Sequence, residues 1–131
     1  MEKRLKLRVA SFWNRSPGKN SRETGEASEK KAEQFLKKQG MKVIARNYSC
    51  KHGEIDLIME DKDSLVFVEV RFRRCDDYGG ALSSVTPSKQ NKIKRSALHF
   101  LLNKKLYEKH PVRFDVIALS ETNQNWIKGA F

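Results

Sequence analysis

The chain has 131 residues and a formal net charge of +11, from 27 lysines and arginines against 16 aspartates and glutamates, so it is long enough for one domain and too short for two. The charge favours polyanionic partners, nucleic acid before an acidic membrane surface, and no apolar run approaches the roughly 18 residues that a membrane span needs. Two cysteines without metal-ligand or disulfide spacing, and no signal-peptide pattern, predict a reducing, cytoplasmic location.

The first 22 residues are predicted to form a basic flexible tail, and residues 23–131 a single folded domain. The tail carries seven basic groups and one acidic group, which leaves a net charge of +5 for the domain. Basic and apolar residues alternate up to Val9, and a linker-like composition follows Phe12 and Trp13. A solubilising extension and a segment that binds phosphate backbones or a membrane surface both fit this composition.

A helix is predicted from residues 21–24 to about Gln39, where Gly40 favours a helix end. Its apolar stripe is formed by Ala32, Phe35 and Leu36. Glu29 precedes this stripe on the same face of the helix, and a carboxylate on the core side of a helix is unusual. Either Glu29 serves a site at the inner face, or it emerges into solvent at the helix end.

Three strands are expected next. Residues 41–47 form the first, and a polar connection over residues 48–52 leads into a β-hairpin of residues 54–59 and 65–71 with a tight turn at 61–63. Side chains alternate along a strand, so the last strand of the hairpin has one apolar face and one mixed face. The apolar face carries Val66, Val68, Val70 and Phe72, and the mixed face carries Phe67, Glu69 and Arg71.

Asp56, Glu69 and Arg71 therefore lie among apolar residues in the two strands of the hairpin. Asp56 is flanked by apolar residues in one strand, and Glu69 and Arg71 are neighbours on one face of the other. Removing such charges from water costs several kcal/mol each unless a metal or a partner compensates. A structural salt bridge of Arg71 with Asp56 or Glu69 and a functional site are both compatible with this pattern.

The rest of the chain predicts a loop, a helix and one or two strands. The double glycine at 79–80 marks the loop, and Thr86 and Pro87 start a helix that runs to about Lys105. Lys89 lies at the first turn of this helix, where backbone N–H groups favour an anion, so a phosphate contact and an ordinary surface lysine are the alternatives. The buried stripe of the helix is Ile93, Ala97, Phe100 and Leu101. Strands at 113–120 and 126–127 complete a mixed sheet flanked by helices, an α/β fold.

With Glu29, Asp56, Glu69 and Arg71 in this order, the sequence resembles the PD-(D/E)xK nuclease superfamily, whose restriction-endonuclease-like core has the order αβββαβ. Over residues 23–131 it is more closely similar to the YraN family of small bacterial proteins. The matching blocks are residues 25–29 with Ala32 and Leu36, then 46–47, 53–58, 66–71, 88–90 and 113–116. Together, these blocks at this spacing are specific for the family.

The resemblance implies metal-dependent cleavage of phosphodiester bonds by Mg²⁺ or Mn²⁺, which neutralises developing charge and activates water. Asp56 and Glu69 match the metal ligands of the superfamily. Glu29 matches an acid that archaeal Holliday junction resolvases contribute from the first helix. Glu54 and Asp115 are weaker candidates, because the first precedes the ligand position and the second lies on a later strand.

Arg71 stands where the superfamily signature has lysine. An arginine stays protonated and cannot act as a base, but it can position water or stabilise the phosphorane. Lys89 and Gln90 are candidates to supply the missing amine or to contact the phosphate. The expected catalytic residues are Asp56, Glu69, Arg71 and Lys89, and the expected metal ligands are Glu29, Asp56 and Glu69. The expected nucleic-acid-binding residues are Arg46, Arg73, Arg74, Lys89, Gln90, Lys92 and Arg95.

The sequence thus predicts a metal-dependent endonuclease that acts on DNA, with branched or structured DNA as the candidate substrate. No element resembles a recognition helix, so little base preference is expected. One alternative is a catalytically inactive nucleic-acid-binding or adaptor protein on a nuclease scaffold, which Arg71 favours. Another is an interaction protein that docks through the tail. Resolvase-like proteins act as two-fold dimers, so a homodimer is also expected.

Overall fold

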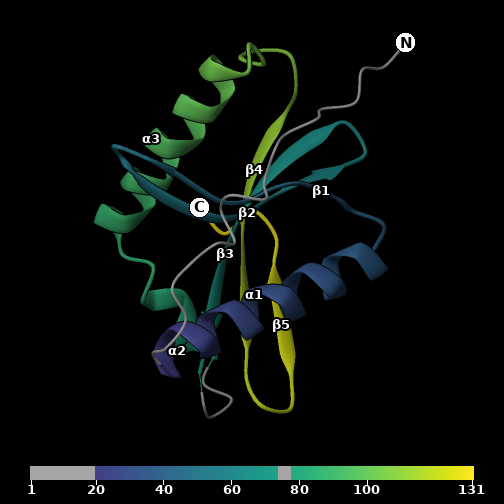
Figure 1. Cartoon of the computed structure of the whole chain (residues 1–131), viewed down its shortest axis with the longest axis vertical. Helices are drawn as coiled ribbons and strands as arrows, with labels where there is room; N and C mark the ends of the chain where they lie inside the picture. The colour runs from purple at the N-terminus through teal and green to yellow at the C-terminus, as the bar shows by residue number, and fades with distance from the viewer. Residues whose placement is uncertain (1–19, 74–77) are drawn as a thin grey trace.

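The computed structural model describes residues 20–73 and 78–131. Its elements are α1 (Asn20–Lys38), β1 (Lys42–Cys50), β2 (Gly53–Asp61), β3 (Ser64–Phe72), α2 (Tyr78–Ser83), α3 (Pro87–Asn103), β4 (Val112–Leu119) and β5 (Gln124–Ile127). The strands form one five-stranded sheet in sequential order (Figure 1). β3 and β4 pair in parallel and the other neighbours pair antiparallel. The predicted αβββαβ order is confirmed, the expected short strand at 126–127 is part of β5, and the helix α2 is added to the prediction.

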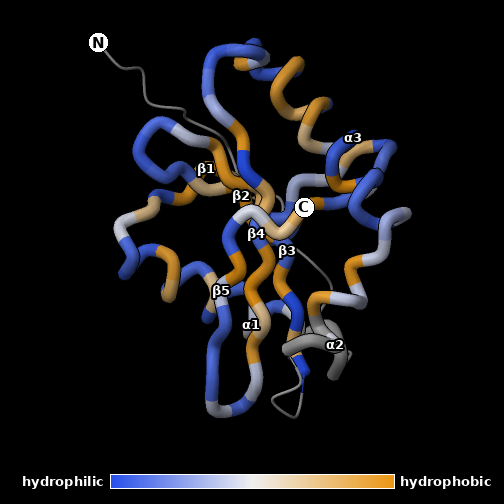
Figure 2. Tube along the Cα trace, turned by 180° about the vertical axis from the view of Figure 1, so that it is seen from behind, coloured by the Kyte–Doolittle hydropathy of each residue, from blue (hydrophilic) through white to orange (hydrophobic). Residues whose placement is uncertain are grey.

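The two long helices cover opposite faces of the sheet, so the core has two layers. On the side of α1, the buried cluster comprises Ala32, Leu36, Met41, Leu57, Met59, Val66, Val68, Ile117 and Leu119. On the side of α3, it includes Phe67, Ile93, Ala97, Phe100, Leu101 and Val116. Apolar residues are concentrated in the central strands (Figure 2). The predicted alternation along β3 is confirmed, because Val66 and Val68 face α1 while Phe67 faces α3.

Local contacts define where α1 ends and where α3 begins. At the end of α1, Gly40 has a φ of +97°, which glycine adopts without strain. The N–H of Met41 then donates to the carbonyl of Leu36 at 3.1 Å, as in a Schellman motif. At the start of α3, the hydroxyl of Thr86 accepts from the N–H of Lys89 at 3.2 Å. Both predicted helix ends are confirmed.

Two expectations about connections are wrong. Residues 48–50 continue β1 instead of forming a polar loop, because Tyr48 and Cys50 pair with Ile55 and Gly53 across the hairpin. The glycines at 79–80 lie in the helix α2 instead of a loop. α2 contacts β3 and β4, and this packing outweighs the low helix propensity of glycine.

The predicted tail lies mostly outside the described residues, which begin at residue 20. α1 starts at Asn20, so residues 20–22 belong to the helix and not to the tail. Within residues 20–73 and 78–131, no helix is both long and apolar enough to cross a membrane.

Candidate active site

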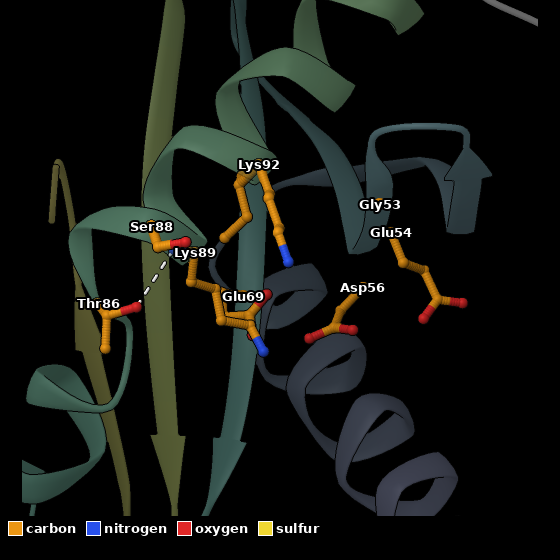
Figure 3. A pocket seen from close by; sticks show the side chains of 9 residues that line it. Gly53, Glu54, Asp56, Glu69, Thr86, Ser88, Lys89 and Lys92 are labelled. Atoms are coloured by element: carbon orange, nitrogen blue, oxygen red, sulfur yellow. Dashed lines mark hydrogen bonds between the residues drawn. The ribbon is translucent and has the colours of Figure 1, made fainter.

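A cavity of about 400 Å³ lies between the start of β2, the middle of β3 and the first turns of α3. It is lined by Gly53, Glu54, Asp56, Glu69, Thr86, Ser88, Lys89, Lys92 and Ile93. Asp56 and Glu69 enter from the sheet, and the ammonium groups of Lys89 and Lys92 point into the same space from α3 (Figure 3). The cavity therefore brings together acids and bases from three elements.

The floor of the cavity forms where β2 and β3 part. The two strands pair from Asp61 and Ser64 as far as Leu57 and Val68, and no further. Beyond that point the carboxylate of Asp56 replaces a backbone partner, because its Oδ2 accepts from the N–H of Val70 at 2.9 Å. Continued by one residue, the register places Asp56 across from Glu69. The divergence of the strands thus exposes two neighbouring acids to one cavity.

The acids at this point are hard to ionise. Burial, followed by repulsion from Asp56, raises the pKa of Glu29 to about 8. The same two causes raise the pKa of Glu69 to about 7, although Arg71 and Lys89 oppose them. Burial also raises the pKa of Asp56, which shares a hydrogen bond with Glu29. The positive charge near the three carboxyl groups therefore does not offset their burial and their mutual repulsion.

Arg71 balances only part of this acid. Its guanidinium forms an ion pair with Glu69, with 3.0 Å between Nη2 and Oε2. Its Nε is buried and has no hydrogen-bond partner among the described residues. The salt bridge that the sequence analysis gave as one alternative is present, with Glu69 as the partner of Arg71. It does not neutralise the site, because the pKa values of Asp56 and Glu69 stay raised beside it.

The donor set is compatible with a hard divalent cation but is not assembled as a closed metal centre. Among the described residues, no group of three or more histidine, cysteine, aspartate or glutamate side chains is arranged to hold a metal ion. Mg²⁺ typically keeps several waters and uses only one or two protein carboxylates. Asp56 and Glu69 offer carboxylate oxygens at one cavity, and Glu29 reaches them through its hydrogen bond to Asp56. Such a set fits Mg²⁺ or Mn²⁺ held mainly by two ligands.

Only some of the predicted nucleic-acid-binding residues lie at the cavity. Lys89 and Lys92 line the cavity, and Arg95 is exposed on α3 outside it. Arg46 lies elsewhere, in a pair of 2.8 Å hydrogen bonds to the carboxylate of Glu33. Arg74 lies outside the described residues.

Two further predicted contacts bind protein carbonyl groups instead of lining the cavity. The guanidinium of Arg73 donates to the carbonyl of Phe72 at 3.0 Å. The side-chain amide of Gln90 donates to the carbonyl of Val85 at 2.9 Å, which supports the turn before α3. The positive charge that faces the acids therefore comes from Arg71, Lys89 and Lys92.

The two weaker acid candidates have different surroundings. Glu54 lines the cavity and accepts a hydrogen bond from the hydroxyl of Ser49 at 3.3 Å. Asp115 is fully buried away from the cavity and accepts from Arg113 at 2.9 and 3.0 Å. It also accepts from the indole of Trp126 at 2.9 Å and from the N–H of Gly129 at 3.0 Å. Asp115 thus ties β5 and the following residues to β4.

Sequence reasoning gave no role to two contributors to the site, although both lie within the blocks that match the YraN family. Asn47 hydrogen-bonds to Glu29 through its side chain, and its φ of +50° within a strand has no signature in the hydrophobic pattern. Gly53 has a φ of +145°, and a Cβ there would lie 3.5 Å from the hydroxyl of Ser96 on α3. That contact would be an ordinary one, so the positive φ is what favours glycine here. The signal that the sequence offered is a glycine before an acidic strand, within the block 53–58 that matches the YraN family.

Comparison with known proteins places these residues in one family. The profile of the uncharacterised protein family UPF0102 matches residues 28–119. A UPF0102 protein of Saccharophagus degradans is 51% identical over 109 residues, which cover 83% of this chain and 92% of that protein. A UPF0102 protein of Herminiimonas arsenicoxydans is 46% identical over 125 residues, which cover 95% and 98% of the two chains. The names of these relatives state no activity.

Proposed function

The chain belongs to the uncharacterised protein family UPF0102, the YraN family of the sequence resemblance, and we propose that it is a metal-dependent endonuclease of the PD-(D/E)xK type that hydrolyses DNA. The observation that carries the proposal is the excess of acid at one cavity. Glu29, Asp56 and Glu69 come from three elements and have raised pKa values in spite of Arg71. A divalent cation is the ligand that relieves such an excess.

In this proposal, Asp56 and Glu69 hold Mg²⁺ or Mn²⁺, and Glu29 supports Asp56 from α1. When bound, the ion would neutralise charge on the phosphate and lower the pKa of the attacking water. Lys89 and Lys92 bind the oxygens of the scissile phosphate or its neighbour from the opposite wall of the cavity. The N-terminal N–H groups of α3 add a positive field at the same wall.

Arg71 and Lys89 divide the role that the signature lysine has in the superfamily. Arg71 stays protonated, so it orients water or a phosphate oxygen and does not remove a proton. Its Nη2 lies 3.0 Å from Oε2 of Glu69, so such a contact would be made beside that carboxylate. A lysine ammonium group, unlike a guanidinium, is a group that enzymes use for proton transfer, and that of Lys89 lies beside Glu69 in the cavity (Figure 3). Lys89 is therefore the better candidate for proton transfer.

The second candidate function is a nucleic-acid-binding or adaptor protein that uses the scaffold without turnover. The absence of a ready three-ligand cluster among the described residues favours it, as does the ion pair between Arg71 and Glu69. In either function, a homodimer would present two cavities to a near-symmetric branched DNA.

Cleavage of labelled four-way and linear DNA in Mn²⁺, Mg²⁺ or EDTA separates these functions. We expect metal-dependent cleavage by the wild type and its loss in Asp56→Asn. Asp61→Asn is the matched control, because Asp61 lies on the same strand but pairs with Arg113 at 3.2 Å, away from the cavity. Salt-sensitive DNA binding without cleavage under any of these conditions would favour the adaptor.

A further inference from the structure

Two consecutive residues of β1 hold two acids of α1 that are one helical turn apart. Arg46 donates from Nε and Nη2 to the carboxylate of Glu33, with both distances 2.8 Å. The side chain of Asn47 hydrogen-bonds to Glu29. Glu29 and Glu33 are four residues apart and so share one face of the helix. We propose that Arg46 and Asn47 are positioning residues that fix the carboxyl group of Glu29 against Asp56, a role that rests on the proposed metal site.

A regular strand cannot make this pair of contacts, because adjacent side chains point to opposite faces. Arg46 pairs with Leu57, which lies in the core cluster under α1. Two residues further, Tyr48 pairs with Ile55, and both lie in the cluster under α3. Residues two apart in a regular strand point to the same side of the sheet, but here they point to opposite sides. The regular alternation of side chains is therefore interrupted at Asn47 in β1 and at Asp56 in β2.

The backbone of Asn47 accounts for this change of face. Its φ of +50° lies in the left-handed region, which costs most residues energy and which asparagine tolerates better than most. The residue is also buried, with 4% of its surface exposed. Backbone strain of this kind persists only where the surrounding structure enforces it, and it is concentrated at functional sites. Here it turns the amide of Asn47 towards Glu29, beside the Arg46 contact.

The pKa values of the two acids of α1 are shifted in opposite directions, that of Glu29 upwards and that of Glu33 downwards. Burial disfavours the ionised form of Glu33, but hydrogen bonds from Arg46 and then Lys37 outweigh it and lower its pKa. Glu33 is thus a fixed, ionised anchor. Glu29 is held one turn away, next to Asp56. Arg46 therefore has an intramolecular role, which is to hold Glu33, and this role differs from the predicted contact with nucleic acid.

The test compares Asn47→Gly with the wild type in the full chain. Glycine keeps the left-handed backbone and removes only the amide. We expect the Kd for Mn²⁺, measured by calorimetry, to rise by about tenfold or more, as for other groups that support a ligand. In the metal-free proteins, the three-bond scalar couplings that report χ1 of Glu29 should have the values of a single rotamer in the wild type. In Asn47→Gly they should have values averaged over several rotamers. Lys62→Gly is the matched control, because Lys62 has a φ of +57° in the turn between β2 and β3.

Arg46→Lys provides a second test if Asn47→Gly does not fold. Lysine keeps the charge but cannot make the two parallel hydrogen bonds to Glu33. A merely structural role would lower stability and leave the Glu29 rotamer unchanged, and that result would overturn the proposal. If the wild type does not bind Mn²⁺, the proposed metal site fails. The Glu29 rotamer then decides the positioning role by itself, because averaging in the folded variants supports it and an unchanged rotamer refutes it.

Discussion

The substitution Glu69→Gln removes one acid from the cavity and keeps the size of the side chain. The pKa of Glu69 rises from 4.5 to about 7 in the folded protein, and this value already includes the attraction of Arg71. The folded protein therefore binds more protons than the unfolded chain between these two values, so the wild type loses stability as the pH rises through them. The loss is about 3 kcal/mol at most, at 1.36 kcal/mol for each pH unit. Glutamine has no proton to lose, so it stays neutral at every pH in this range and escapes this cost.

We expect the two proteins to be similarly stable near pH 4.5 and Glu69→Gln to be the more stable by up to about 3 kcal/mol near pH 8.5. Urea unfolding followed by circular dichroism, with EDTA present, measures this difference at each pH. Glu121→Gln is the control, because Glu121 is exposed in the turn after β4 and its substitution should change stability by less than about 0.5 kcal/mol. A variant that is less stable than the wild type near pH 8.5 would refute the reasoning. The ion pair with Arg71 would then outweigh the repulsion between the acids.

The remaining predictions concern the metal, the support of the sheet and the two basic residues. The raised pKa values of Glu29 and Glu69 imply that Mn²⁺ binding releases protons, so its affinity should rise from pH 6 to pH 8.5, and calorimetry in two buffers measures both effects. Asp115→Asn turns an amide towards several donors and should cost about 3 to 5 kcal/mol in urea unfolding without changing Mn²⁺ affinity. Arg71→Lys should keep Mn²⁺ binding and raise the cleavage rate at alkaline pH, measured on labelled DNA. Lys89→Ala should lower that rate. It should also reduce the slope of the logarithm of the DNA-binding constant against the logarithm of salt concentration by about 1, the value for one phosphate contact.

Periodicity predicted the central sheet because each of its strands has two distinct buried faces. Val66 and Val68 pack under α1, and Phe67 packs under α3, as their alternation requires. The connections were harder to predict. The double glycine at 79–80 favoured a loop by propensity, but contacts of α2 with β3 and β4 decided otherwise. Such contacts join residues distant in sequence, so no local pattern contains them.

The acids of the site were identified from the sequence, but their arrangement was not. In the sequence, Glu29 and Asp56 stand out only as charges in apolar surroundings, and their hydrogen bond depends on how α1 crosses the sheet. The contribution of Asn47 depends on one backbone angle inside a strand. Arg46 was predicted to contact nucleic acid, and only the structure places Glu33 within 2.8 Å of it.

The chemistry of Asp56 bears most directly on the choice between nuclease and adaptor. Its hydrogen bond from the N–H of Val70 requires an oxygen but not a charge, so asparagine would serve the fold equally well. The charge instead raises the pKa values of both Glu29 and Glu69. A scaffold that only binds nucleic acid gains nothing from an acid there, because a carboxylate repels phosphate. A protein that uses the acid to hold a cation gains the ligand that its reaction needs, and it accepts reduced stability in exchange. Asp56→Asn should therefore stabilise the metal-free protein while it abolishes Mn²⁺ binding, and equal Mn²⁺ affinity in both proteins would favour the adaptor.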